Sequence, residues 1–177
     1  MKKLICFAVS LMVTLSIAAF SDAQAAGDPS IPRQVSVHGN WGLYVYQDNG
    51  HKVCFITSKP TKSKGKYTKR GNVHTFITHW TEDSTKNVFN VATGYPYKTG
   101  SMVTVKIDGK KYTLATTKGE TAWADDQSTD NALAGAIQKG SNMVIQGTSQ
   151  RGTLTTDTYS LKGSGAAYKA LEAACKI

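Results

Sequence analysis

The sequence predicts an all-β protein, an antiparallel sandwich with two short helices. Short runs of alternating apolar and polar residues repeat along the chain, and turn signals such as Asn49-Gly50 and Asp108-Gly109 separate them. Only two segments show helical periodicity, and they do not alternate with the strands as helices do in a parallel sheet. The chain has 16 Gly against 4 Pro, and it is rich in Thr and Val, which favours strands over helices.

The strand pattern begins after an extended, proline-containing lead-in at 26–36. In the first strand, Trp41, Leu43 and Val45 share one face. In the return strand over 52–57, alternation places Cys54 with Ile56 on one face. The remaining strands of about eight are expected at 73–80, 87–93, 102–107, 111–116, 142–149 and 153–161.

Helical periodicity marks two segments. The first spans 130–139, with Thr129 as the expected N-cap and Gly140 as the stop signal. The second is rich in alanine and follows Ser164, which we expect to cap it. Its apolar stripe ends at Cys175 and should face the sheet.

The N-terminus has the pattern of a secretory signal. Lys2 and Lys3 precede an apolar stretch from Leu4 to Phe20, and Ala23-Gln24-Ala25 provides a cleavage motif. We therefore expect a signal peptide over 1–25, a single domain over 26–177, and a periplasmic, secreted or cell-surface location. The alternative is an uncleaved N-terminal anchor. No second long apolar run follows, so we expect no membrane-spanning segment in the mature chain.

Two cysteines remain after the expected cleavage, because Cys6 lies in the signal. An even pair in an exported chain predicts a disulfide between Cys54 and Cys175. The alternative is two buried free thiols. Two cysteines cannot by themselves form a structural zinc site, which requires four ligands.

A cluster of cations is the strongest local signal. It lies between two expected strands, contains no acid, and contributes to a net charge of +9. As a flexible loop it would suit polyanions such as host-surface sulfated glycans or lipopolysaccharide. We do not expect nucleic acid as a partner, because the chain is exported and lacks nucleic-acid-binding motifs. The alternative is a solvated loop that protects sheet edges. Its members are Lys59, Lys62, Lys64, Lys66, Lys69 and Arg70.

The sequence predicts no catalytic site and no metal site. His74 and His79 fall on opposite faces of one strand, and neither G-x-S-x-G nor a metal-binding histidine motif is present. We therefore expect no enzyme activity, no cofactor and no metal. One alternative is a small secreted hydrolase that uses Asp125, Asp126 and His79. Another is a structural partner of an outer-membrane complex that pairs through exposed strand edges.

Eight short segments follow one another in an order typical of one known family. They are Trp41-Gly42-Leu43-Tyr44, Val53-Cys54-Phe55-Ile56, Gly94-Tyr95-Pro96, Ala122-Trp123-Ala124-Asp125, Met143-Val144-Ile145, Ser149-Gln150-Arg151-Gly152-Thr153, Asp157-Thr158-Tyr159-Ser160-Leu161 and Ala173-Ala174-Cys175. Together they resemble the invasion-associated locus B family of exported bacterial proteins, and the two cysteines also lie where the family usually has them.

The resemblance implies an immunoglobulin-like sandwich exported by Gram-negative cells. It also implies a role in the entry of pathogens into host cells, while members in non-pathogens suggest a general envelope function. It supplies no catalytic residue. We therefore expect an exported, non-enzymatic envelope or surface protein that supports invasion by binding a partner or a polyanion.

Overall fold

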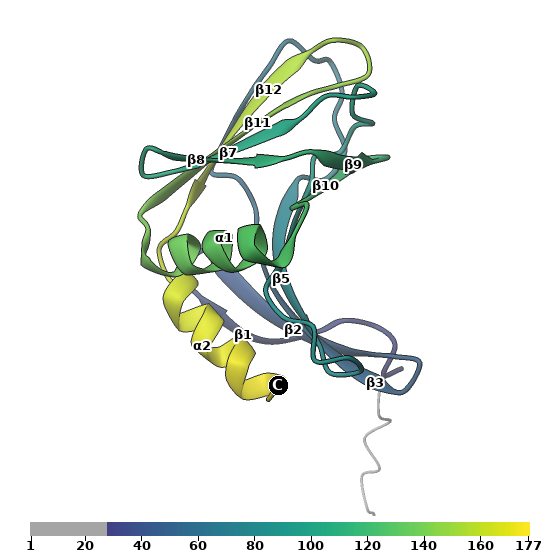
Figure 1. Cartoon of the computed structure of the whole chain (residues 1–177), viewed down its shortest axis with the longest axis vertical. Helices are drawn as coiled ribbons and strands as arrows, with labels where there is room; N and C mark the ends of the chain where they lie inside the picture. The colour runs from purple at the N-terminus through teal and green to yellow at the C-terminus, as the bar shows by residue number, and fades with distance from the viewer. Residues whose placement is uncertain (1–27) are drawn as a thin grey trace, which may run out of the picture.

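The computed structural model describes residues 28–177, so the predicted signal peptide over 1–25 lies outside the described residues. Two antiparallel sheets and two helices make up this part of the chain (Figure 1). Neither helix has the length and apolar character needed to cross a membrane. The predicted fold class, an all-β antiparallel sandwich with two short helices, is confirmed.

The first sheet has seven strands in the order β1-β2-β3-β5-β6-β10-β9. Most neighbours are joined by hairpins, so the sheet follows the chain closely. Its strands are β1 (Arg33–His38), β2 (Trp41–Asp48), β3 (His51–Ser58), β5 (His74–Trp80), β6 (Val88–Ala92), β9 (Thr116–Lys118) and β10 (Thr121–Trp123).

The second sheet has five strands in the order β4-β12-β11-β7-β8. It brings together segments that are far apart in the sequence, since β4 comes from the predicted basic loop and pairs with β12 near the C-terminus. Its strands are β4 (Lys62–Lys64), β7 (Val103–Ile107), β8 (Lys110–Leu114), β11 (Asn142–Thr148) and β12 (Leu154–Ser160).

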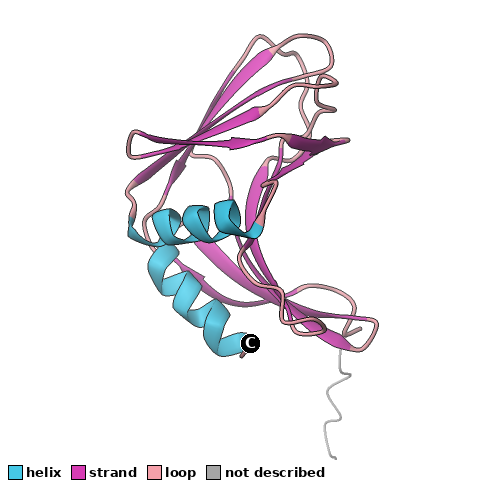
Figure 2. Cartoon of the chain, in the orientation of Figure 1, coloured by secondary structure: helices cyan, strands magenta, loops and turns pink. Residues whose placement is uncertain are grey.

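The core lies between the sheets and under the helices. α1 (Gln127–Lys139) packs on β6 and on α2 (Ser164–Ala174), and α2 also packs on β1, β2 and β3. Figure 2 shows both helices on the same side of the seven-stranded sheet. Trp41 is fully buried, and its indole Nε1 donates a hydrogen bond to the Ser160 carbonyl at 3.2 Å, which joins the two sheets.

Four strands were not predicted, and each is short or at an edge. β1 lies at the edge of its sheet, and its two valines, Val35 and Val37, are exposed rather than turned to the core. β4, β9 and β10 are three residues long, too short to show a period. β4 pairs with β12 and β10 pairs with β6, partners that are distant in sequence and that a local pattern does not reveal, whereas β9 pairs only with its neighbour β10.

Both helix caps differ from the prediction. α1 begins at Gln127, and the side chain of Asp126 accepts a hydrogen bond from the Thr129 amide at 2.7 Å. α2 is preceded by Gly163 at a φ of 90°, a conformation that favours glycine. The buried Ser164 hydroxyl instead donates to the carbonyls of Ile137 and Leu161, so it ties α2 to α1 rather than capping its own helix.

A disulfide joins Cys54 of β3 to Cys175 at the end of α2. The two cysteines are 121 residues apart in sequence, and both side chains are buried. The bond therefore holds the C-terminal helix against the inner face of the seven-stranded sheet.

Candidate anion-binding face

The predicted basic loop is divided between two surfaces. Lys59 lines a hollow beside β1 and β3. The next residues enter β4, where Lys62 and Lys64 pair opposite Thr158 and Thr156 of β12. Because side chains alternate along a strand, these two lysines share the outer face of the five-stranded sheet, away from the core.

Cross-strand register extends this outer face over all five strands. Lys62 lies opposite Thr158, Thr158 opposite Val144, Val144 opposite Lys106, and Lys106 opposite Lys111. A second row starts at Lys64 and continues through Thr156, Gln146, Thr104 and Thr113. We call this surface the basic face, defined by these ten residues.

No carboxylate interrupts the basic face. Its ten residues are cationic, hydroxyl-bearing, amide-bearing or apolar, whereas Asp157 of β12 faces the core. Within residues 28–177 only two ion pairs form, His51–Glu82 and Arg70–Asp157. The four lysines of the face are therefore not neutralised by acidic side chains.

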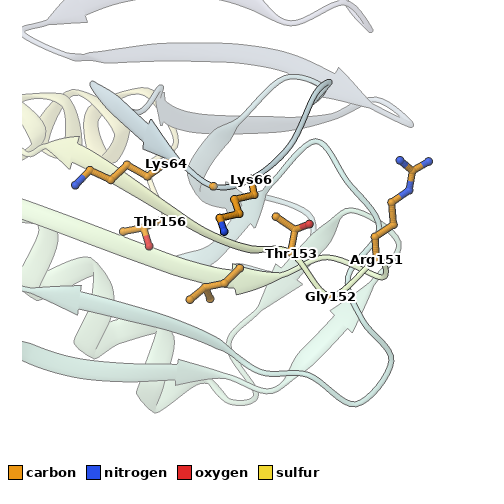
Figure 3. A pocket seen from close by; sticks show the side chains of 8 residues that line it. Lys64, Lys66, Arg151, Gly152, Thr153 and Thr156 are labelled. Carbon is orange, nitrogen blue, oxygen red and sulfur yellow. The ribbon is translucent and has the colours of Figure 1, made fainter.

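A groove lies at one end of this face, beside the turn between β11 and β12. It encloses about 650 Å³, and its cations are Lys64, Lys66 and Arg151. In the view of Figure 3 the Lys66 side chain points between Thr156 and Thr153, while the Arg151 guanidinium extends outward from the turn. Two elements distant in sequence, the 59–70 segment and the β11–β12 turn, thus place their cations around one opening.

Arg70 corrects the prediction, because it is not a surface cation. Its guanidinium donates two hydrogen bonds to the Asp157 carboxylate, at 2.8 and 2.6 Å, and its Nε donates to the Thr93 carbonyl at 2.6 Å. The Arg70 side chain is 5% exposed and that of Asp157 is 1% exposed. The guanidinium also lies 5.0 Å from the Tyr95 ring centre. Arg70 is an internal anchor for the basic segment.

The family described as "Invasion associated locus B (IalB) protein" matches residues 41–172. The chain belongs to this family. The crystal structure of invasion associated protein B from Bartonella henselae is similar to this IalB-family fold, with a TM-score of 0.55 and 17% identity. The match covers 81% of this chain and 96% of the Bartonella chain. A search of curated proteins finds no match.

Sequence reasoning missed several residues of the basic face in this IalB-family protein. Lys106 and Lys111 lie far from the 59–70 segment in sequence, and Arg151 lies in a turn. The outward position of Lys106 follows from alternation in its strand, but its alignment with Lys62 depends on the order of the strands. Strand order was the information that the sequence pattern lacked.

The residues considered for hydrolysis have structural roles. Asp126 caps α1, and Asp125 accepts hydrogen bonds from the Ala115 amide and the Thr116 hydroxyl. His79 is buried and bonds to Asn87 at 3.2 Å. In the part of the chain that the structure describes, no hydrogen bond joins His79 to either aspartate, and no group of three or more His, Cys, Asp or Glu residues could hold a metal ion.

Burial lowers the pKa of His79 below its ordinary value, so the folded protein binds a proton at this ring less readily than the unfolded chain. The contribution of His79 to the free energy of unfolding is therefore fully present above a pH of about 6.5, and it is lost as the pH drops through the pKa of His79 in the folded protein. We expect the free energy of unfolding to decrease between pH 7.5 and 5.5, and His79→Gln to flatten that decrease.

Urea unfolding at several pH values in this range measures the effect. His51→Gln is the control, because it also removes one imidazole but at an exposed side chain rather than a buried one. If His79→Gln has the same pH profile as the wild type, burial of His79 is not the cause of the loss of stability at low pH.

Proposed function

We propose that this IalB-family protein is an exported, non-enzymatic protein that supports host-cell invasion by binding anionic oligosaccharides on its basic face. The observation that carries the proposal is the row of cations and hydroxyls across five strands, without a carboxylate among them. The predicted signal peptide and the Cys54–Cys175 disulfide support a periplasmic, secreted or cell-surface location.

The dimensions of the face favour an extended ligand. Neighbouring strands lie about 4.8 Å apart, so the four spacings from β4 to β8 span roughly 19 Å. Lysine side chains bind sulfate or phosphate as point charges, and the interleaved threonine hydroxyls can hydrogen-bond to the same oxygens. A polymer that carries several anionic groups can therefore contact lysines at both edges of the sheet.

The position of Lys106 argues against the alternative that these lysines only protect the edges of the sheet. Lysines on the edge strands β4 and β8 could serve only to block edge-to-edge association. β7 is an interior strand, however, and its Lys106 lies directly opposite Lys111. Like charges in directly opposed positions destabilise a sheet, so edge protection does not account for this pair.

Retention on immobilised heparin in a salt gradient tests the proposal. The face variant carries Lys62→Gln, Lys64→Gln, Lys106→Gln and Lys111→Gln. The matched control loses four exposed lysines elsewhere, at Lys86, Lys139, Lys169 and Lys176. We expect the wild type and the control to elute above the physiological ionic strength of about 0.15 M, and the face variant well below it.

Competition then distinguishes two sources of the same anionic chemistry. Heparan sulfate oligosaccharides and purified lipopolysaccharide are each added to the bound wild-type protein, and the more effective competitor identifies the ligand source. If the face variant and the control lose retention equally, net charge alone explains binding. That result would reject the basic face as a site.

A further inference from the structure

The outer face of the seven-stranded sheet carries a second unassigned surface. Register places Gly42 opposite Thr57, Thr57 opposite Phe76, and Tyr44 opposite Phe55. These side chains alternate with core residues such as Cys54, so they point away from the helices. The aromatic residues on this face are all partly exposed, and they are Tyr44, Tyr46, Phe55, Phe76, Trp80 and Trp123.

Four rings form a continuous row across β2, β3 and β5. Tyr44 stacks on Phe55 with a centroid distance of 5.2 Å and an angle of 5° between the rings. Phe55 meets Phe76 at 5.8 Å, and Phe76 stacks on His74 at 5.7 Å. Both ends of this row, Tyr44 and His74, reach the wall of one hollow.

The hollow has a volume of about 440 Å³, within the range of roughly 300–1,000 Å³ typical of small-molecule sites. Gly42 and Thr57 lie opposite each other beneath it. A Cβ on Gly42 would lie 3.0 Å from Cε2 of Tyr44 and 3.7 Å from Nε2 of Gln34. The absence of a side chain at Gly42 therefore keeps this space open beside the Tyr44 ring.

Polar groups surround the aromatic wall. The Tyr44 hydroxyl donates to Oε1 of Gln34 at 3.2 Å, which leaves the Gln34 amide N–H groups for a ligand. The Thr57 hydroxyl lies 3.3 Å from Nδ1 of His74. Of the residues that line the hollow, Lys59 is the one with a permanent charge, and none is an acid. Burial, together with the nearby Lys59 charge, lowers the pKa of His74 and so favours its neutral ring.

We propose that this hollow binds a pyranose ring that carries one carboxylate. The apolar C–H face of a pyranose can stack on the electron-rich face of the Tyr44 ring. Its hydroxyls can hydrogen-bond to Gln34 and Thr57, and its carboxylate complements Lys59. The hollow therefore offers an aromatic ring for the apolar face of an acidic sugar, neutral hydrogen-bonding groups for its hydroxyls and one cation for its carboxylate.

A peptide strand fits this surface less well. Strand addition would use the unpaired backbone edge of β1, which lies at the end of the sheet. The hollow instead opens on the face between β1 and β3, over Gly42 and Thr57. Its hydrogen-bonding groups are side chains, which suits a ligand with many hydroxyls rather than a peptide backbone.

Titration of the isotope-labelled, oxidised protein with methyl β-glucuronide and methyl β-glucoside tests the site by amide chemical shifts. We expect both probes to shift residues around Gly42 and Thr57, and the acid to bind more tightly. Lys59→Gln should weaken binding of the acid by about tenfold and leave the neutral sugar unchanged. Gly42→Val should abolish binding of both, because its side chain fills the hollow.

Lys69→Gln is the matched control, since Lys69 is exposed in the same segment but does not line the hollow. The four-lysine face variant should still bind methyl β-glucuronide, so this test is independent of the heparin result. Unchanged binding in both Lys59→Gln and Gly42→Val would overturn the proposal. Absence of shifts with either sugar, or a second copy of the chain occupying this face in solution, would also overturn it.

Discussion

Asp157→Ala is expected to lower the free energy of unfolding by about 3–5 kcal/mol, because it leaves the Arg70 guanidinium buried without its partner. Arg70 is held inside the protein by two bonds to Asp157 and one to the Thr93 carbonyl. The remaining carbonyl bond and the Tyr95 ring cannot replace a carboxylate. Urea unfolding followed by tryptophan fluorescence measures the loss.

The double variant Arg70→Met, Asp157→Leu is the control. It removes both charges together, and we expect it to be more stable than Asp157→Ala, since apolar residues of similar size can replace a buried ion pair at little cost. A loss below about 1 kcal/mol in Asp157→Ala, the range of exposed pairs, would contradict the buried-pair account.

Removal of the disulfide by Cys54→Ala and Cys175→Ala should cost about 2–5 kcal/mol. The bond links residues 121 positions apart, so it restricts much of the unfolded chain. Comparing urea unfolding of the oxidised wild type and the double variant gives the difference directly.

The same comparison under reducing conditions is the control. Reduced wild-type protein should unfold near the midpoint of the double variant, because both lack the bond between β3 and the end of α2. Equal stability of the oxidised wild type and the double variant would show that the disulfide contributes nothing to the fold.

The fold could be predicted largely because its longer strands are half-buried. Trp41 and Leu43 in β2, or Val103 and Val105 in β7, alternate with outward residues, and this alternation is visible in the sequence. Edge strand β1 has no such buried face, because its valines, Val35 and Val37, are exposed. The three residues of β4 form a strand only because β12 offers a partner almost a hundred residues away.

The candidate site could be predicted only in part. A run of lysines between strands is visible in the sequence, but its division between the basic face and the Lys59 hollow depends on where the chain crosses from β3 to β4. Arg70 was misplaced because its partner, Asp157, is distant in sequence. The sequence shows that basic residues are concentrated in one segment. The order of the strands determines which of these residues lie on the same surface.

The most direct test of the central claim, that anions bind across the five-stranded sheet, is a titration of the labelled protein with a sulfated heparin tetrasaccharide. The basic-face account predicts amide shifts in β4, β7, β8 and β12 together, including residues near Lys106, and their loss in the four-lysine face variant. Shifts confined to the segment from Lys66 to Lys69, or spread equally over α1 and α2, would contradict it.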